Sequence, residues 1–311
     1  MSRNVAIDVL KLILAFMVVG LHVGIGGEFL TNGLFRIAVP LFLLINGYYF
    51  FPILSKGNEI SWLKRLVSLY CIWMLIYSYF WFHIPDATVQ SYINLLRVML
   101  IGYHHLWYVS GMVGAAIMLI FLKKSNNIQL ITLVTLLFLI GVIIQYSGNY
   151  HYFKGSYLDN LFNQHFVHRN FLFFSLPFFV IGYLINKYSV QTKIGFRLSV
   201  FLSGIGLTLL LLESITNYQQ PTRDGGFDNY FSLIIVCPAI FILFSKIKIE
   251  ADTKSIALFS SAIYFLHVWV MKLLERFTEL DSYLLVFFTI LLSLFASKIL
   301  IFINNRFKYF L

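Results

Sequence analysis

The residues best able to do chemistry lie near the start of the chain, at Asp8, Lys11 and His22. Asp8 and Lys11 are three residues apart, so on a helix they share a face and can pair. His22 follows Lys11 by eleven residues, an axial rise of about 16 Å that leaves it within ~20° of the same stripe. A lysine can hold a phosphate, and a neutral imidazole can take a proton from a hydroxyl. This face therefore predicts a site for a substrate that is anionic at one end and reactive at the other.

The element that carries these residues belongs to a chain with the composition of a membrane protein. Of 311 residues, 59% are apolar or aromatic and 12% are charged, and the mean hydropathy is +0.82. This excludes a cytosolic enzyme, a disordered chain and a secreted disulfide scaffold. We predict an all-α polytopic membrane helical bundle, with one domain over residues 1–311 and about ten transmembrane helices. The predicted spans are residues 5–24, 34–52, 63–82, 104–122, 128–146, 171–187, 196–214, 228–246, 255–273 and 283–303.

The distribution of basic residues predicts the orientation of the bundle. With ten spans and the N-terminus in the cytoplasm, fourteen Lys and Arg fall on the inner side and seven on the outer side, which is the bias that membrane proteins show. Both termini are then cytoplasmic. The net charge of +10 reflects this bias and anionic lipid, so we expect no nucleic-acid partner. Cys71 and Cys237 lie in apolar stretches, as buried inert thiols do.

Polar groups within the spans are costly and are therefore functional candidates. Those expected at the outer depth of His22 are Asn46, His104, His105, Trp107, Arg169 and His267. The outer hydrophilic segments near 83–103, 147–170 and 215–228 are rich in Tyr, His, Asn, Gln and Asp; they suit either binding of a polar ligand or solvated loops. No carboxylate accompanies these histidines at ligand spacing, so we expect no metal.

A structural interpretation of the same residues stays open. Lys11 can extend its ammonium group to the membrane interface, and His22 can form a hydrogen bond to a neighbouring helix. For His104 and His267, packing between helices is as good an interpretation as a catalytic role.

Six blocks in order along the chain resemble the acyltransferase 3 family of bacterial membrane O-acyltransferases, and together they cover residues 5–270. The first block, which carries most of the resemblance, is Lys11, ten intervening positions and His22. The others are Pro40-Leu41-Phe42 with Asn46-Gly47-Tyr48, the basic pair Lys64-Arg65, His105-Leu106-Trp107-Tyr108, Arg169-Asn170-Phe171 with Leu176-Pro177-Phe178-Phe179-Val180-Ile181-Gly182-Tyr183, and Ile263-Tyr264-Phe265-Leu266-His267.

The resemblance implies an O-acetyltransferase of the bacterial cytoplasmic (inner) membrane. It would move an acetyl group from cytoplasmic acetyl-CoA, the donor substrate, to a hydroxyl of a cell-surface polysaccharide or its lipid-linked precursor. The implied catalytic residues are His22, Lys11 and Asp8. Lys11, Lys64 and Arg65 would hold the acyl-CoA, and His105, Trp107, Arg169, His267 and Asn46 would bind the acceptor. Some members carry an additional SGNH domain; here we expect the transfer to be completed within the membrane.

Two other classes of protein fit part of the pattern. A transporter or flippase for a lipid-linked sugar or a small solute also has many spans and charges within the membrane. However, the two halves of this chain show no inverted repeat, and the charges within the spans cluster on the first of them. A structural partner of a glycan assembly complex gives no reason for Lys11 and His22 to share a stripe. We therefore favour the acyltransferase.

Overall fold

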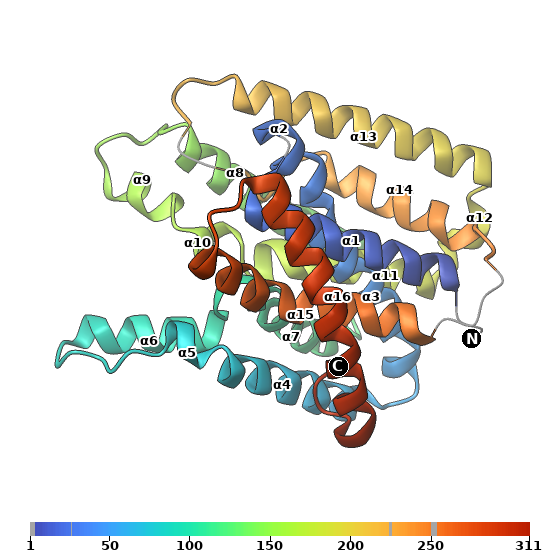
Figure 1. The fold of residues 1–311 in the computed structure, drawn as a ribbon. Helices are drawn as coiled ribbons and strands as arrows, with labels where there is room; N and C mark the ends of the chain where they lie inside the picture. Colours follow the sequence, from blue (N-terminus) through green and yellow to red (C-terminus); the bar gives the residue numbers. More distant parts are fainter. Residues whose placement is uncertain (1–3, 26, 224–225, 250–253) are drawn as a thin grey trace.

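The computed structural model describes residues 4–25, 27–223, 226–249 and 254–311, and this part of the chain contains helices and no strand (Figure 1). Seven of its helical segments are long and apolar enough to cross a membrane. They are α1 (Val5–Val23), η1 (Leu34–Ile37) with α3 (Ala38–Ser55), η2 (His104–Leu106) with α7 (Trp107–Leu122), α8 (Asn127–Asn149), α13 (Phe196–Tyr218), α15 (Lys254–Phe277) and α16 (Ser282–Phe307).

The three other predicted spans correspond to helices that are shorter or less apolar. These are α4 (Glu59–Ile76), the π-helical turn η3 (Phe171–Ser175) with α11 (Leu176–Lys187), and α14 (Leu233–Lys246). The prediction of an all-α membrane bundle is confirmed, whereas the count of ten spans and the cytoplasmic position of both termini stay predictions. The remaining short helices are α2 (Glu28–Thr31), α5 (Ser78–Trp81), α9 (Tyr157–Phe162), α10 (His165–His168) and α12 (Val190–Lys193).

One helix outside the predicted spans is longer than the others there. α6 (Val89–Ile101) lies in the outer segment 83–103, which the sequence interpretation treated only as hydrophilic. Its exposed side chains are largely apolar, among them Tyr92, Leu96 and Leu100, and no residue of the helix is buried. The helix is too short to cross a membrane, and because polar residues surround it, the sequence pattern did not indicate it.

Local signals at both ends define α1. The side chain of Asn4 accepts hydrogen bonds from the backbone N–H groups of Ala6 and Ile7, which caps the first turn. Gly24 adopts φ 79° after the last turn, a left-handed conformation that ends a helix at little cost in glycine. Because the helix is continuous between these caps, Lys11 and His22 lie on the same uninterrupted helix.

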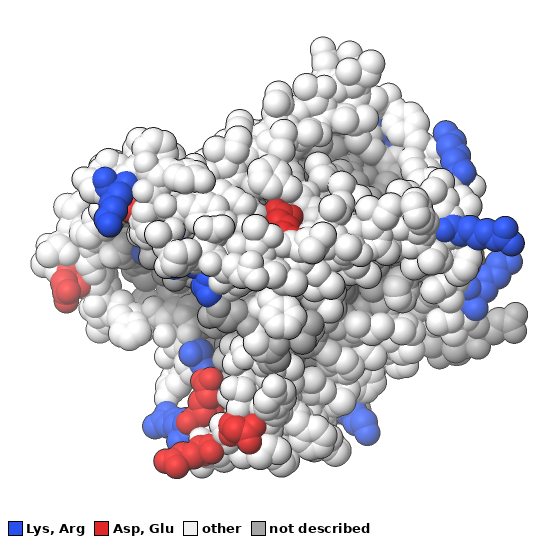
Figure 2. Space-filling view, turned by 90° about the horizontal axis from the view of Figure 1, so that it is seen from above, with Lys and Arg blue, Asp and Glu red and all other residues white. Residues whose placement is uncertain are grey.

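α1 occupies the middle of the bundle, where it packs against α3, α14, α15 and α16 (Figure 1). The hydroxyl of Ser260 on α15 donates to the carbonyl oxygen of Lys11 at 2.8 Å. By contrast, α8 and α13 expose apolar side chains such as Ile143 and Leu212. On the face in Figure 2, most charged side chains lie toward the two ends of the molecule, with only Lys and Arg at the right-hand end and one acidic side chain near the middle. This is the pattern of an apolar belt between two polar faces.

Two glycines let α3 and α11 approach each other closely. A Cβ atom at Gly47 would overlap the carbonyl oxygen of Phe179, and one at Gly182 would overlap that of Leu44. Asn186 strengthens the contact by donating from Nδ2 to the carbonyl oxygen of Tyr48 at 2.6 Å. Small residues commonly allow such contacts between membrane helices. The pairing fixes the orientation of α3 in the bundle.

Candidate active site

Four histidines from α1, η2 and α15 come together at one end of α1. The ring centroid of His22 lies 4.5 Å from that of His104 and 5.3 Å from that of His267. The His105 ring lies 5.0 Å from the His267 ring. Within residues 4–25, 27–223, 226–249 and 254–311, no group of three or more His, Cys, Asp or Glu could hold a metal ion.

The hydrogen bonds of His267 define which of its two ring nitrogens carries the hydrogen. Its Nδ1 lies 2.7 Å from the carbonyl oxygen of Tyr264, and because a carbonyl oxygen can only accept, Nδ1 carries the hydrogen. In the neutral ring Nε2 is then an acceptor, and this atom is buried without a partner in the described part of the chain. Both ring nitrogens of His105 are also buried without a partner there. Leaving such a group unpaired costs about 1–3 kcal/mol, which is a reason to expect a functional role.

His104 adopts a backbone conformation that is unusual for its residue type. Its φ is +50°, in the left-handed region that residues other than glycine seldom occupy. Strain of this kind persists where the surrounding structure imposes it, often at functional sites. Here it places the His104 ring against His22.

A cavity of about 290 Å³, which we call the histidine cavity, opens beside this cluster. Its lining includes His22, His105, Trp107, Tyr108, Arg169 and Tyr264, together with Arg36 and Asp228. Aromatic and apolar side chains mixed with several charged and polar ones suit a small polar ligand or one residue of a larger one.

A buried ion-pair cluster borders the histidine cavity. Arg36 pairs with Asp228, and Arg169 approaches the same carboxylate at 3.1 Å while its guanidinium lies 4.7 Å from the Trp107 ring. Asp228 precedes α14, outside the membrane-spanning helices. Burial acts to raise the pKa of its carboxyl, but the two guanidinium groups prevail and hold the pKa well below its usual range. Burial lowers the pKa of nearby His168 to about 4, so this histidine is uncharged at neutral pH. The Arg36, Asp228 and Arg169 side chains then carry two positive charges and one negative charge, a net charge of one.

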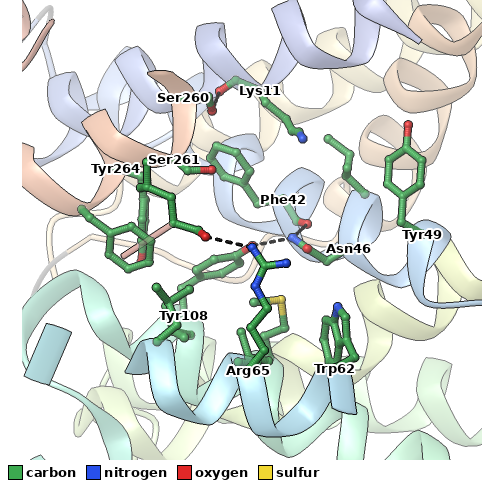
Figure 3. A pocket seen from close by; sticks show the side chains of 17 residues that line it. Lys11, Phe42, Asn46, Tyr49, Trp62, Arg65, Tyr108, Ser260, Ser261 and Tyr264 are labelled. Carbon is green, nitrogen blue, oxygen red and sulfur yellow. Dashed lines mark hydrogen bonds between the residues drawn. The ribbon is translucent and has the colours of Figure 1, made fainter. Parts of the chain in front are cut away.

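Lys11 lines a second cavity, of about 280 Å³, which we call the lysine cavity (Figure 3). Lys11 Nζ lies 3.2 Å from Asp8 Oδ1, so the predicted pair is present. Arg65 reaches into the cavity from α4, and its Nη2 donates to the backbone oxygen of Leu311 at 2.9 Å. Two cations among aromatic walls suit an anionic ligand that also has apolar parts.

Tyr108 and Tyr264 line both cavities, so the cavities meet at this pair. The two ring centroids are 5.4 Å apart. Asn46 Nδ2 donates to the Tyr108 hydroxyl at 2.8 Å, and the Tyr264 hydroxyl donates to the carbonyl oxygen of His105 at 2.5 Å. The pair is the partition between the lysine cavity and the histidine cavity.

Most candidate residues from the sequence come together at the two cavities, although Asn46 lies at an unexpected depth and Lys64 lies elsewhere. The histidine cavity holds His22, His105, Trp107 and Arg169, with His267 in contact with His22, and the lysine cavity holds Lys11 and Arg65, with Asp8 paired to Lys11. Asn46 was expected at the depth of His22, but it lines the lysine cavity. Asn46 is the ninth of the 18 residues of α3, so it lies midway along that helix and not at its beginning.

Lys64 lies at the surface and lines neither cavity. Successive residues of a helix point about 100° apart, so Arg65 on α4 faces the lysine cavity while its neighbour faces away.

Sequence reasoning missed Arg36, Asp228, Tyr108 and Tyr264 as site residues. Arg36 entered only the count of basic residues on the outer side, Asp228 was given no role, and the two residues are 192 positions apart. Tyr108 and Tyr264 were part of the recognised blocks without a role. The chain contains 19 tyrosines, and the sequence does not indicate which of their hydroxyl groups face a cavity.

Comparison with known proteins gives one family and several relatives. The model of a family described as "Acyltransferase domain" matches residues 4–303. The chain is 24% identical to a serine/alanine racemase of Enterococcus gallinarum, over 99% of this chain and 47% of that protein. It is also 24% identical to an amino-acid racemase of Enterococcus faecalis, over 89% of this chain and 42% of that protein. The chain thus spans less than half the length of these curated relatives. No solved structure matches it significantly.

Proposed function

Because the chain belongs to the acyltransferase family whose model matches nearly all of it, we propose that it transfers an acetyl group from cytoplasmic acetyl-CoA to a hydroxyl of a cell-surface polysaccharide or its lipid-linked precursor. The observation that carries the proposal is the meeting of two cavities at one partition. One cavity contains Lys11 and Arg65, and the other contains His22. An acyl donor and an acceptor can then approach the same point from opposite sides of the inner membrane.

The lysine cavity is the proposed donor site. Lys11 and Arg65 bind the phosphates of acetyl-CoA by charge-assisted hydrogen bonds, and the aromatic walls contact the pantetheine arm. Asp8 holds Lys11 in place through its ion pair. The thioester then lies at the partition formed by Tyr108 and Tyr264.

The histidine cavity is the proposed acceptor site. The ring of Trp107 offers a flat surface for the apolar face of a sugar, and Arg169 is held against that ring. His22 takes the proton of the acceptor hydroxyl as general base. The acceptor oxygen forms a bond to the carbonyl carbon, the carbon–sulfur bond breaks, and the proton passes to the sulfur of CoA.

The names of the relatives do not change this proposal. They describe amino-acid racemases, but the chain matches less than half of each protein, so racemase activity is not proposed for it. Transport of a solute is the competing function, since two cavities at opposite ends of a bundle are also found in transporters.

Mass spectrometry of surface glycan separates these functions. Glycan from cells that lack the gene is compared with glycan from the same cells complemented with the wild-type gene. We expect each repeat to lose the mass of one acetyl group when the gene is absent and to regain it on complementation. Unchanged glycan mass together with lost glycan export or lost solute uptake would instead identify a transporter.

Lys11→Ala is expected to raise the KM for acetyl-CoA about 10- to 100-fold, with a smaller effect on the acceptor. A hydrogen bond to a charged group contributes about 1.5–3 kcal/mol, and each 1.4 kcal/mol is about tenfold in affinity. The measurement is incorporation of radiolabelled acetyl into glycan by membrane vesicles at varied acetyl-CoA. Lys124→Ala, at an exposed position after α7, is the matched control. Equal effects on donor and acceptor would contradict the assignment of Lys11 to the donor.

A further inference from the structure

The two tyrosines of the partition use their hydroxyl groups differently. The Tyr264 hydroxyl donates its only hydrogen to the carbonyl oxygen of His105. The Tyr108 hydroxyl accepts a hydrogen bond from Asn46, and among the described residues it donates to no protein group. A tyrosine hydroxyl carries one hydrogen and can also accept. The hydrogen of Tyr108 is thus available to a ligand at the point where the cavities meet.

Asn46 defines this arrangement. Its Nδ2 also donates to the carbonyl oxygen of Phe42, on its own helix, at 2.8 Å. Because that carbonyl oxygen can only accept, the amide of Asn46 must present its nitrogen and not its oxygen to Tyr108. The Tyr108 hydroxyl is therefore an acceptor toward Asn46 and keeps its own hydrogen for another partner.

Packing holds the ring of Tyr108 in one position. The residue is buried, and its ring centroid lies 6.0 Å from that of Phe42 and 5.4 Å from that of Tyr264. A hydrogen-bond donor that is fixed in advance, in surroundings with little water, stabilises developing negative charge far more than a mobile donor in water does.

We propose that Tyr108 is a catalytic residue that donates its hydroxyl hydrogen bond to the carbonyl oxygen of the acyl thioester. The inference rests on the proposed acyl transfer. When the acceptor oxygen attacks, the electron pair of the carbonyl double bond moves onto the carbonyl oxygen, and Tyr108 stabilises that oxyanion. When the double bond re-forms, the carbon–sulfur bond breaks and CoA leaves with the proton that His22 removed. Tyr108 ends the cycle as it began, with its hydrogen.

Tyr108→Phe tests the proposal, because it removes the hydroxyl and keeps the ring. In vesicles supplied with radiolabelled acetyl-CoA we expect kcat to fall about 100-fold, as on loss of one oxyanion donor, while the KM for acetyl-CoA stays within about threefold. Tyr70→Phe is the matched control, since the hydroxyl of Tyr70 donates to the carbonyl oxygen of Met99 on α6 and the residue lines neither cavity.

Incorporation of 3,5-difluorotyrosine at position 108 gives a second readout that does not depend on deleting the hydroxyl. The fluorinated phenol is more acidic and loses its hydrogen at lower pH. The high-pH limb of the rate profile should therefore move to lower pH, whereas a tyrosine that only packs would leave the limb in place.

The outcomes separate this inference from the proposed function. If the wild-type protein transfers no acetyl group, the proposed function fails. If the wild-type protein is active and Tyr108→Phe keeps its kcat, or the difluorotyrosine variant keeps the wild-type pH profile, acyl transfer stands and the role of Tyr108 is overturned.

Discussion

Replacing His22 by alanine is expected to abolish acyl transfer while the protein remains folded in the membrane. Loss of a general base costs about 10²- to 10⁴-fold in rate. The effect on folding should be small, because within the described residues His22 contacts the rings of His104 and His267 but makes no hydrogen bond that alanine would leave unpaired. The measurement is acetyl content of surface glycan, together with the amount of protein in isolated membranes.

Two further variants sharpen this test. His22→Gln keeps a polar side chain of similar reach without a basic nitrogen, and we expect it to be as inactive as the alanine variant. His83→Ala removes an exposed histidine between α5 and α6 and serves as the control. Near-normal acetylation with either His22 variant would contradict a catalytic role for this residue.

Asp228→Asn is expected to destabilise the folded protein by about 3–5 kcal/mol, the cost of removing one partner from a buried ion pair. The substitution leaves the guanidinium groups of Arg36 and Arg169 close together without the carboxylate that separates them. The measurement is thermal unfolding of the purified protein in detergent. Asp86→Asn, at an exposed position before α6, is the control and should unfold like the wild type.

The same pair of proteins predicts a pH dependence. In the folded state the pKa of Asp228 is lowered from its usual value of 3.8, so the carboxylate stabilises the fold fully at neutral pH and progressively less as the pH falls below that value. The difference in unfolding temperature between wild type and Asp228→Asn should therefore be constant from pH ~7 to ~5 and shrink toward pH ~3. A difference that does not change with pH would show that charge is not what Asp228 contributes.

Sequence patterns predicted single helices well where length, hydropathy and caps agree. The first span was expected at 5–24, and α1 runs Val5–Val23 because Asn4 and Gly24 cap it. The third span was expected at 63–82, yet α4 begins at Glu59 and ends at Ile76. Glu59 begins the helix because its carboxylate suits a helix N-terminus and pairs with Lys123 at 3.1 Å. A search for runs of apolar residues does not include a charged residue such as Glu59, so it placed the start of this helix too late.

For the candidate site, helical periodicity predicted which residues lie on one face of a helix. It did not predict which residues from different helices come into contact. Asp8, Lys11 and His22 could be placed on one face because eleven residues nearly complete three turns. That the rings of His104 and His267 approach His22 depends on how α1, η2 and α15 pack. Tyr108 required even finer information, since its candidate role follows from which atom of Asn46 faces it.

The contact between α3 and α11 has a consequence for how a donor gains access. The backbones of the two helices lie in close contact at Gly47 and Gly182, so we expect the two helices to move as one unit. α4 is different, because eight of its 18 residues are exposed, Arg65 among them, and it contributes Arg65 and Trp62 to the lysine cavity. We expect a donor to gain access by displacing the side chains that α4 contributes to this cavity, while α3 and α11 keep their positions.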